Sequence, residues 1–272
     1  MRGRGVGRST LKMLKEFIRR ADQALLGGLS SRLKQQLSDF RQERRWRAEA
    51  DVGPSYRLVS SYRENRSELF WKLCDTYGSD KAESTSLHST PSVSHSYADF
   101  YSRLFAHCRG GVTRVFECGL GTNNPDFVSN MGLRGRPGAS LRVWRDYFPN
   151  ATVIGADIDR EVLFSEDRIQ TFYVDQLDPA AIASFWQSVG LDDFDLMVDD
   201  GLHTFEAGRC LFEHSIGHLA PSGIYIIEDV KLGDLVSFKR YFSGKPYCVD
   251  YVNLYRPHAP LSDNNLVVIR RP

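Results

Sequence analysis

Between Val112 and Arg270, short apolar segments alternate with amphipathic helical segments, and this alternation limits the possible folds more than any other feature. Strands are predicted at residues 112–117, 152–156, 171–174, 194–198, 224–227, 247–253 and 265–270, and helices at residues 140–148, 179–189, 205–219 and 232–242. Strands that alternate with helices imply a parallel sheet covered by helices on both faces. We therefore predict an α/β fold, a Rossmann-like, seven-stranded, doubly wound sheet that closes with an antiparallel pair.

Two of these strands end in acidic pairs, Asp199 with Asp200 and Glu228 with Asp229. If the two strands are parallel neighbours, the four carboxylates meet at the edge of the sheet where ligands bind in α/β proteins. Together with His203 they indicate a hard divalent cation with a general base beside it. The alternative is that these residues only cap the following helices, since Asp favours N-cap positions. Two acidic pairs and a histidine favour the functional interpretation.

The first strand runs into Glu117-Cys-Gly-Leu-Gly121, a tight glycine turn that lets a ligand approach the backbone. No third glycine follows, so the turn is a poor pyrophosphate cradle, and NAD would prefer a helix N-terminus. Asp157 ends the second strand, where a carboxylate can accept ribose hydroxyls. Asp175-Gln176, at the end of the third strand, is expected to border the adenine of a cofactor. Glu117 is suited to bind a cationic amino group or an ordered water. These features indicate a phosphate-free cationic cofactor such as S-adenosylmethionine.

Six motifs in this order resemble those of class I S-adenosylmethionine-dependent methyltransferases, and more narrowly the metal-dependent macrolide and sugar O-methyltransferases. They are Glu117-Cys-Gly-Leu-Gly121, Gly138-Ala-Ser-Leu-Arg142, Gly155-Ala-Asp-Ile-Asp159, Asp175-Gln176, Asp199-Asp-Gly-Leu-His203 and Gly223-Ile-Tyr-Ile-Ile-Glu-Asp229. The resemblance covers residues 70–270. It departs from the family at Leu202, where Ser is common, and in the long insertion Asn123–Pro137.

The resemblance implies a role for each matched residue. Mg²⁺ would be held by Asp200, Glu228 and Asp229, and His203 would be the general base. The cofactor set would be Glu117, Gly119, Gly121, Thr122, Ser140, Asp157, Ile158, Asp175, Gln176 and Asp199. The implied reaction is Mg²⁺-assisted O-methylation of a hydroxyl on a sugar or a glycosylated natural product.

Methyl transfer to a sugar hydroxyl needs an activated oxygen. A Mg²⁺ ion chelated by two vicinal hydroxyls lowers the acceptor's pKa and orients it, and a histidine can take the proton. Two alternatives remain open. One is a cephalosporin 7α-hydroxylase-like member of the same superfold, and the other is a non-catalytic scaffold protein that keeps the fold.

The N-terminal region is basic, and the rest of the chain is acidic. Residues 1–50 contain 13 Lys/Arg and 5 Asp/Glu, a balance of +8 that leaves −7 for the remainder. We predict a basic helical extension and linker at residues 1–66 and a methyltransferase domain at residues 67–272. The extension suits a helical arm on another subunit or a solvated face, with peripheral membrane contact as the alternative, and we expect a homo-oligomer. Without a recognition module, nucleic-acid binding is not expected.

Targeting and cysteine patterns favour a cytoplasmic protein. The five cysteines include no CxxC pair, which argues against a zinc site or a disulfide framework. No secretory signal or membrane-spanning segment is expected. Helices are also predicted at residues 67–77 and 97–106. Two interpretations are open for the aromatic side chains of His95, Tyr97 and Tyr101. They line the wall of a substrate site, or they pack a helix against the core, and neither interpretation is favoured.

Overall fold

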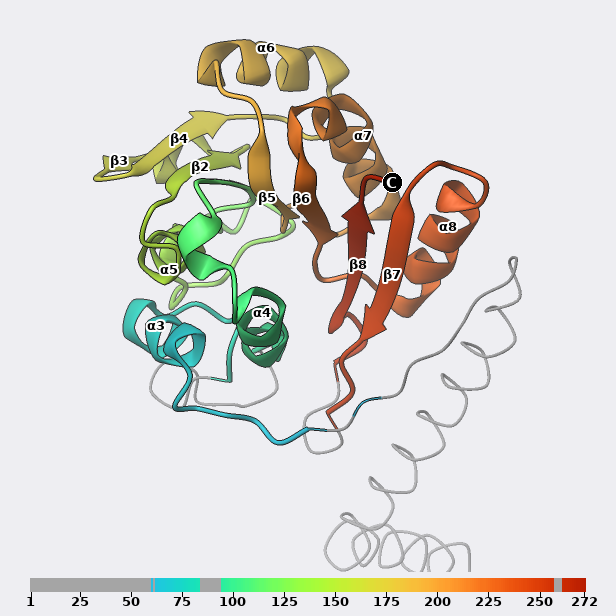
Figure 1. Ribbon diagram of the computed structural model, residues 1–272. Helices are drawn as coiled ribbons and strands as arrows, with labels where there is room; N and C mark the ends of the chain where they lie inside the picture. Colours follow the sequence, from blue (N-terminus) through green and yellow to red (C-terminus); the bar gives the residue numbers. More distant parts are fainter. Residues whose placement is uncertain (1–59, 61, 84–93, 257–260) are drawn as a thin grey trace, which may run out of the picture. The chain divides into compact units, whose positions relative to one another are not determined.

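A computed structural model describes residues 60, 62–83, 94–256 and 261–272. Residues 56–272 form one compact unit. Its centre is an eight-stranded sheet with strand order β3-β4-β2-β1-β5-β6-β8-β7 (Figure 1). The strands are β1 (Arg114–Cys118), β2 (Thr152–Asp157), β3 (Ser165–Glu166), β4 (Ile169–Tyr173), β5 (Phe194–Asp199), β6 (Leu219–Ile227), β7 (Cys248–Asn253) and β8 (Asn265–Arg270). Of the extension and linker predicted at residues 1–66, residues 1–59 and 61 lie outside the described residues.

The middle of the sheet is parallel, as predicted. β1 pairs in parallel with β2 and β5, and the parallel order continues outward to β4 and β6. β8 then lies antiparallel between β6 and β7. All seven predicted strands are present, and the two-residue β3 adds an eighth, antiparallel to β4. Its two residues are exposed and too few to show a hydrophobic period, which is why the sequence did not reveal it.

Helices cover both faces of the sheet. On one face, α3 (Leu69–Tyr77) packs against α4 (Tyr97–Phe105) and α5 (Ala139–Tyr147); on the other lie α6 (Pro179–Val189), α7 (Phe205–Ser215) and α8 (Leu232–Phe242) (Figure 1). The period-two alternation of β1 sends side chains to both layers. Val115 joins the core under α3–α5, whereas Phe116 packs on Phe185 and Trp186 of α6.

The predicted boundary between the helix at 205–219 and the next strand was wrong. α7 ends at Ser215, a short 3₁₀ turn covers Ile216–His218, and β6 already begins at Leu219. The segment Pro221-Ser-Gly223 resembles a turn in sequence. In the structure β6 passes through it, with a register irregularity against β5 opposite this segment.

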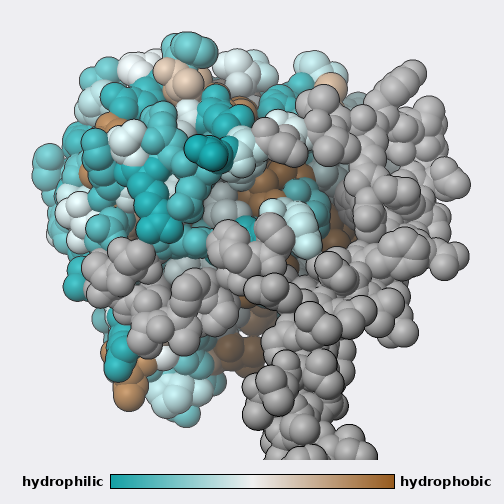
Figure 2. Space-filling model, turned by 90° about the horizontal axis from the view of Figure 1, so that it is seen from below, coloured by the Kyte–Doolittle hydropathy of each residue, from teal (hydrophilic) through white to brown (hydrophobic). Residues whose placement is uncertain are grey.

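The strand registers bring the predicted site residues to one edge. Cys118 is paired with both Ala156 and Asp199, and Asp199 is paired with Ile227. The carboxyl ends of four neighbouring strands are therefore level with one another. Seen from below Figure 1, the surface is mostly hydrophilic, and hydrophobic residues show within a recess (Figure 2). In the part of the chain that the structure describes, no helix has the length and apolar character to cross a membrane.

Candidate active site

The turns after β5 and β6 are held by backbone hydrogen bonds that continue the sheet. The Asp200 amide donates to the Cys118 carbonyl at 2.8 Å, and the Glu228 amide donates to the Asp199 carbonyl at 2.9 Å. The chain then makes a short turn into α7, which Thr204 caps by accepting a hydrogen bond from the Ala207 amide. These bonds give the acidic side chains at the edge a rigid backbone.

A buried lysine lies among three of the carboxylates. Lys81, in the segment after α3, is 1% exposed. Its ammonium lies 3.0 Å from Glu117 Oε1 and 2.7 Å from Asp200 Oδ2, and it also pairs with Glu228. We call Glu117, Asp200 and Glu228 the inner group. Sequence reasoning did not identify Lys81, whose ammonium lies against Glu117 where a cationic amino group of the cofactor or an ordered water was expected.

Burial and charge pairing oppose each other in the inner group. Burial alone would lower the pKa of Lys81, but Asp200, Glu117 and Glu228 outweigh it and raise that pKa well above its usual value. Burial raises the pKa of Glu228 well above the ordinary range and also raises the pKa of Glu117, in both cases against the attraction of Lys81. Burial would also raise the pKa of Asp200, but Lys81 and His203 lower it.

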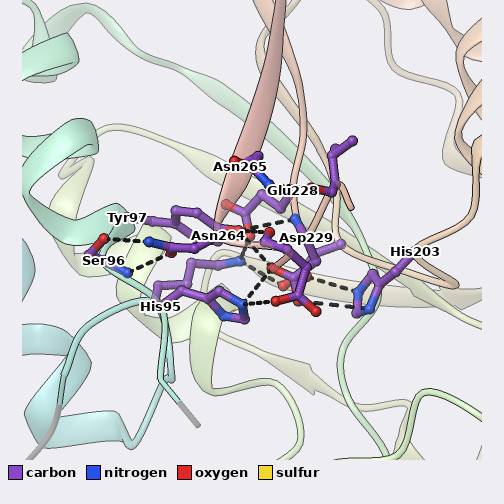
Figure 3. Close-up of polar contacts among 12 residues, drawn as sticks. His95, Ser96, Tyr97, His203, Glu228, Asp229, Asn264 and Asn265 are labelled. Atoms are coloured by element: carbon purple, nitrogen blue, oxygen red, sulfur yellow. Dashed lines mark hydrogen bonds and ion pairs between the residues drawn. The ribbon is translucent and has the colours of Figure 1, made fainter. Parts of the chain in front are cut away.

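A second cluster lies toward Asp229, and we call Asp200, His203 and Asp229 the outer group (Figure 3). His203 Nε2 is 3.3 Å from Asp200 Oδ1, and His203 Nδ1 is 3.7 Å from Asp229 Oδ2. On the other side of Asp229, His95 Nε2 lies 3.3 Å from Oδ1, and the Tyr97 hydroxyl donates to the same oxygen at 2.8 Å.

Two residues of the outer group have strained backbones. His203 has φ +57° and Asp229 has φ +53°, in the left-handed region that non-glycine residues seldom adopt. Such strain concentrates at functional sites, where the surrounding structure holds it in place. Here it directs the two side chains toward each other across the carboxyl edge.

Both histidines carry a proton in this arrangement. Burial would lower the pKa of His203, but the Asp200 carboxylate, 3.3 Å away, and the charge of Asp229 raise it to about 10. At His95, burial would again lower the pKa, but Asp229 and Asp263 raise it to about 9. The two imidazolium rings are therefore the counter-cations of Asp200 and Asp229.

The predicted metal ligands are divided between the two groups. In each group the ligand atoms lie within 4.8 Å of one another, and Asp200 belongs to both. Asp229 belongs to the outer group, whereas Glu228 belongs to the inner group and accepts hydrogen bonds from Lys81 and the Tyr101 hydroxyl. Carboxylate oxygens are the ligands that Mg²⁺ prefers in proteins. The Asp200 and Asp229 carboxylates of the outer group can hold such a cation in place of the imidazolium charges beside them, whereas the inner group already holds an ammonium.

The glycine turn lies directly against the metal side of the edge. Gly119 has φ +98°, and a Cβ at this position would lie 2.0 Å from the Asp200 carbonyl oxygen. Gly121 has φ +78°, and a Cβ there would lie 1.9 Å from the sulfur of Met131. The positive φ favours glycine at both positions, and at 119 the added Cβ would also meet backbone, so the turn and the Asp200 loop are in backbone contact.

Asp157 holds the glycine turn from the end of β2. One of its carboxylate oxygens accepts a hydrogen bond from the Leu120 amide at 2.7 Å, and the other accepts one from the Asp159 amide at 2.8 Å. Burial raises its pKa, although these amides oppose the rise. The next residue, Ile158, is 44% exposed, as a residue facing a ligand would be.

The remaining residues predicted to bind the cofactor form hydrogen bonds along the same carboxyl edge of the sheet. Ser140 donates to Glu117 at 2.6 Å, and Thr122 donates to Asp159 at 2.5 Å. Asp175 accepts a hydrogen bond from the Leu177 amide at 2.9 Å.

Gln176 connects the cofactor rim to the acidic edge. Its amide group donates to Asp199 Oδ1 at 3.1 Å, and its carbonyl accepts from the Leu202 amide at 2.7 Å. Burial raises the pKa of Asp199 to about 6, although Gln176 opposes the rise. Asp199 is thus joined to Gln176, whereas its neighbour Asp200 belongs to both the inner and the outer group.

No family model matches the chain. Its sequence is 32% identical over 160 residues to demethylmacrocin O-methyltransferase of Streptomyces fradiae, covering 58% of this chain and 38% of that protein. It is 31% identical over 160 residues to mycinamicin VI 2''-O-methyltransferase of Micromonospora griseorubida, covering 58% and 37%. It is 31% identical over 137 residues to the 8-demethyl-8-alpha-L-rhamnosyl tetracenomycin-C 2'-O-methyltransferase of Streptomyces olivaceus, covering 50% and 34%. The matches thus span well under half the length of these relatives.

Solved structures show the same fold. The MycE methyltransferase from the mycinamycin biosynthetic pathway, in complex with Mg, SAH and mycinamycin VI, superposes with TM-score 0.51 at 25% identity, over 75% of this chain and 54% of that one. Its complex with Mg and SAH gives TM-score 0.52 at 23% identity, over 76% and 55%. The chain therefore has the class I methyltransferase fold and, over the matched region, is similar in sequence to macrolide and sugar O-methyltransferases.

Proposed function

We propose that this protein is an S-adenosylmethionine-dependent, Mg²⁺-assisted O-methyltransferase that acts on a hydroxyl of a sugar or glycosylated natural product. The observation that carries the proposal is the contact between the Gly119 turn and the Asp200 backbone. This contact joins the turn expected to receive the methyl donor to the group expected to hold the cation. Relatives named O-methyltransferases, and a neighbour whose structure contains Mg and SAH, support the same interpretation.

In this proposal the cofactor residues bind and orient the methyl donor. The glycines at 119 and 121 allow close approach to the backbone, Asp157 faces the ribose, and Asp175 with Gln176 borders the adenine. Ile158 offers apolar contact to the adenine ring. Glu117 would influence the methyl donor only through Lys81 and Ser140, because its carboxylate is fully buried between these two side chains.

The metal side would activate the acceptor. Asp200 and Asp229 would hold Mg²⁺, with His203 beside it; the third carboxylate of the family set, Glu228, is engaged by Lys81 and Tyr101. A bound Mg²⁺ supplies Lewis-acid polarisation of the acceptor hydroxyl. His203 would then accept the hydroxyl proton. The carboxylates that raise the pKa of His203 are the ones that would hold the cation, so their occupation favours the neutral imidazole that a base requires.

A methyl-transfer assay separates the proposal from its rivals. The protein is incubated with S-adenosylmethionine labelled in the methyl group and a panel of glycosylated macrolides and aromatic polyketides, with Mg²⁺ or with excess chelator, while oxygen is monitored. We expect label in a sugar hydroxyl only with Mg²⁺. Oxygen consumption without label would favour the hydroxylase-like alternative, and no binding of S-adenosylmethionine would favour the scaffold. His203→Gln should slow transfer by about 10² to 10⁴.

The finer assignments stay predictions. Homo-oligomer formation through the basic extension, its alternative of peripheral membrane contact, the cytoplasmic location and the domain boundary after residue 66 were inferred from sequence. Analytical ultracentrifugation of the full chain beside a variant that lacks residues 1–50 would test the oligomer.

A further inference from the structure

Arg256 has a buried guanidinium group, and one edge of that group makes no hydrogen bond. The residue is 6% exposed, and its Nη1 donates to the carboxylate of Glu83, which is itself buried. Its Nε and Nη2 are also buried and have no hydrogen-bond partner in the part of the chain that the structure describes. Buried donors are nearly always paired, and an unpaired charged donor is especially costly. The unpaired edge of Arg256 therefore indicates a binding position for a ligand.

The strand registers bring Arg256 to the carboxyl edge of the sheet, where the candidate active site lies. Ile227, the last residue of β6, pairs with Val267 of β8. Asn253, the last residue of β7, pairs with Asn265 of β8. β7 therefore ends at the same edge as β6, and Arg256 follows the end of β7 by three residues.

Hydrogen bonds join the segment after β7 to the outer group. The Asn264 side chain donates to the Leu254 carbonyl at 2.5 Å and to Ser96 Oγ at 2.8 Å (Figure 3). Ser96 directly precedes α4, whose first residue, Tyr97, donates to Asp229 at 2.8 Å. The guanidinium is thus carried on a segment that is fixed to the same side chains as the predicted metal ligand Asp229.

The free edge of the guanidinium has the geometry of an anion-binding group. Nε and Nη2 present two roughly parallel N–H donors, which match two oxygens of a carboxylate or a phosphate. Glu83 engages only Nη1 of Arg256, and its other oxygen lies 4.0 Å from Nη2 of Arg66. Two arginines beside this carboxylate leave a net positive charge close to the acidic strand ends. That charge would attract an anionic acceptor that the carboxylates alone would repel.

We propose that Arg256 binds an anionic group of the acceptor, a carboxylate or a phosphate, through Nε and Nη2. The inference rests on the proposed function and narrows its acceptor to an acidic sugar, either a uronic acid or a sugar that carries phosphate. Arg256 positions this acceptor and selects it over neutral sugars. It takes no part in methyl transfer itself.

The binding of matched sugars tests the proposal in the absence of cofactor and metal. Calorimetry in a chloride buffer measures the affinity of the full chain for methyl glucuronide, glucose 1-phosphate and methyl glucoside. We expect the wild type to bind at least one of the two anionic sugars at least tenfold more tightly than methyl glucoside. The sugar that binds more tightly identifies the anionic group as carboxylate or phosphate.

Arg256→Lys should abolish this preference. A lysine keeps a positive charge opposite Glu83 but cannot present two parallel N–H donors, so a purely structural role of Arg256 predicts an unchanged preference. Arg240→Lys is the matched control, because Arg240 is exposed near the end of α8, and it should keep the preference. The proposal is overturned if the wild type binds neither anionic sugar more tightly than methyl glucoside, or if the preference survives in Arg256→Lys.

A wild-type crystal soaked in the anionic sugars keeps the test decisive if Arg256→Lys does not fold. The carboxylate or phosphate oxygens should accept hydrogen bonds from Nε and Nη2 of Arg256, with Glu83 still on Nη1. An ordered water on Nε and Nη2, with the anionic group bound elsewhere or absent, would overturn the proposal.

Methyl transfer to acidic and neutral sugars separates this inference from the proposed function. If the preference for anionic sugars depends on Arg256 but no acceptor takes up label from S-adenosylmethionine, the anion site is supported and the proposed function fails. If matched acidic and neutral acceptors take up label with equal kcat/KM, the proposed function is supported and this inference fails.

Discussion

Lys81 Nζ lies 2.7 Å from Asp200 Oδ2, although 119 positions separate the two residues in the chain. The contact brings the segment after α3 to the carboxyl edge of the sheet. Tyr97 and Tyr101 of α4 reach the same edge and donate to Asp229 and Glu228. The helices before β1 are thus part of the candidate site as well as of the core.

Gly119→Ala should destabilise the protein by at least about 2 kcal/mol, because an added Cβ meets the Asp200 carbonyl at 2.0 Å and φ is +98°. It should also weaken binding of S-adenosylhomocysteine. Gly233→Ala is the matched control, since nothing lies within 4 Å of its added Cβ and its φ is not in the left-handed region. Urea denaturation compares the two variants, and equal stability would contradict the close contact between the two loops.

Tyr101→Phe should cost about 1–3 kcal/mol of stability, because it removes a hydroxyl that donates to the buried Glu228 carboxylate. The ring would still stack on Phe70. Tyr147→Phe alters another buried tyrosine of the same core cluster and should change stability by less than about 0.5 kcal/mol. If the two variants show the same midpoint of urea denaturation, the Glu228 contact contributes nothing.

The cofactor and metal halves of the edge should be separable by mutation. Asp200→Asn should abolish Mn²⁺ binding to the outer group and leave the affinity for S-adenosylhomocysteine nearly unchanged. Asp157→Asn should do the reverse, because Asp157 holds the glycine turn and belongs to neither the inner nor the outer group. Calorimetric titrations measure both affinities in both variants. Loss of both ligands in each variant would show that the two halves are one coupled site.

The Glu166 carboxylate should make stability depend on pH. Hydrogen bonds from Arg142, and the charge of Arg145, hold its pKa below the usual range against a smaller effect of burial. A lowered folded-state pKa stabilises the fold above the unfolded value of about 4.3, and the contribution is lost as pH falls through the folded-state value. Because the side chain is 35% exposed, the contribution should be only about 0.2–1 kcal/mol.

Glu166→Gln measures this contribution. In urea, the wild type should be more stable than the variant at pH 7, and the difference should disappear well below pH 4. A difference that stays constant over this range would assign the effect to packing instead of charge.

Local signals explain which parts of the fold could be predicted from sequence. α6 was predicted with the bounds it has, because Asp178 caps it, Pro179 begins it and Gly190 ends it at φ +62°. The β6 boundary was wrong because a proline and a glycine that normally mark a turn lie within a strand. β3 was missed because two residues carry no periodic pattern.

The site was predictable where it follows strand ends. Asp199, Asp200, Glu228 and Asp229 were identified because parallel strands align their carboxyl ends. Lys81 was not, because its partners are distant in sequence and no pattern around it indicates burial. One signal was available in the sequence. Glu117 lies within an apolar strand, with other carboxylates expected beside it, so a cation was needed to balance their charge. Composition alone does not show which residue supplies that cation. The division of the metal residues into two groups follows from Lys81, so it was missed with it.

The most direct test of the account is whether the bound methyl donor lies beside a bound divalent cation. S-adenosylmethionine labelled with ¹³C in its methyl group is bound to the full chain, and its methyl resonance is followed as Mn²⁺ is added. We predict strong paramagnetic broadening that is reversed by chelator and absent in Asp200→Asn. A bound methyl resonance that Mn²⁺ leaves sharp, or broadens equally in Asp200→Asn, would contradict the account.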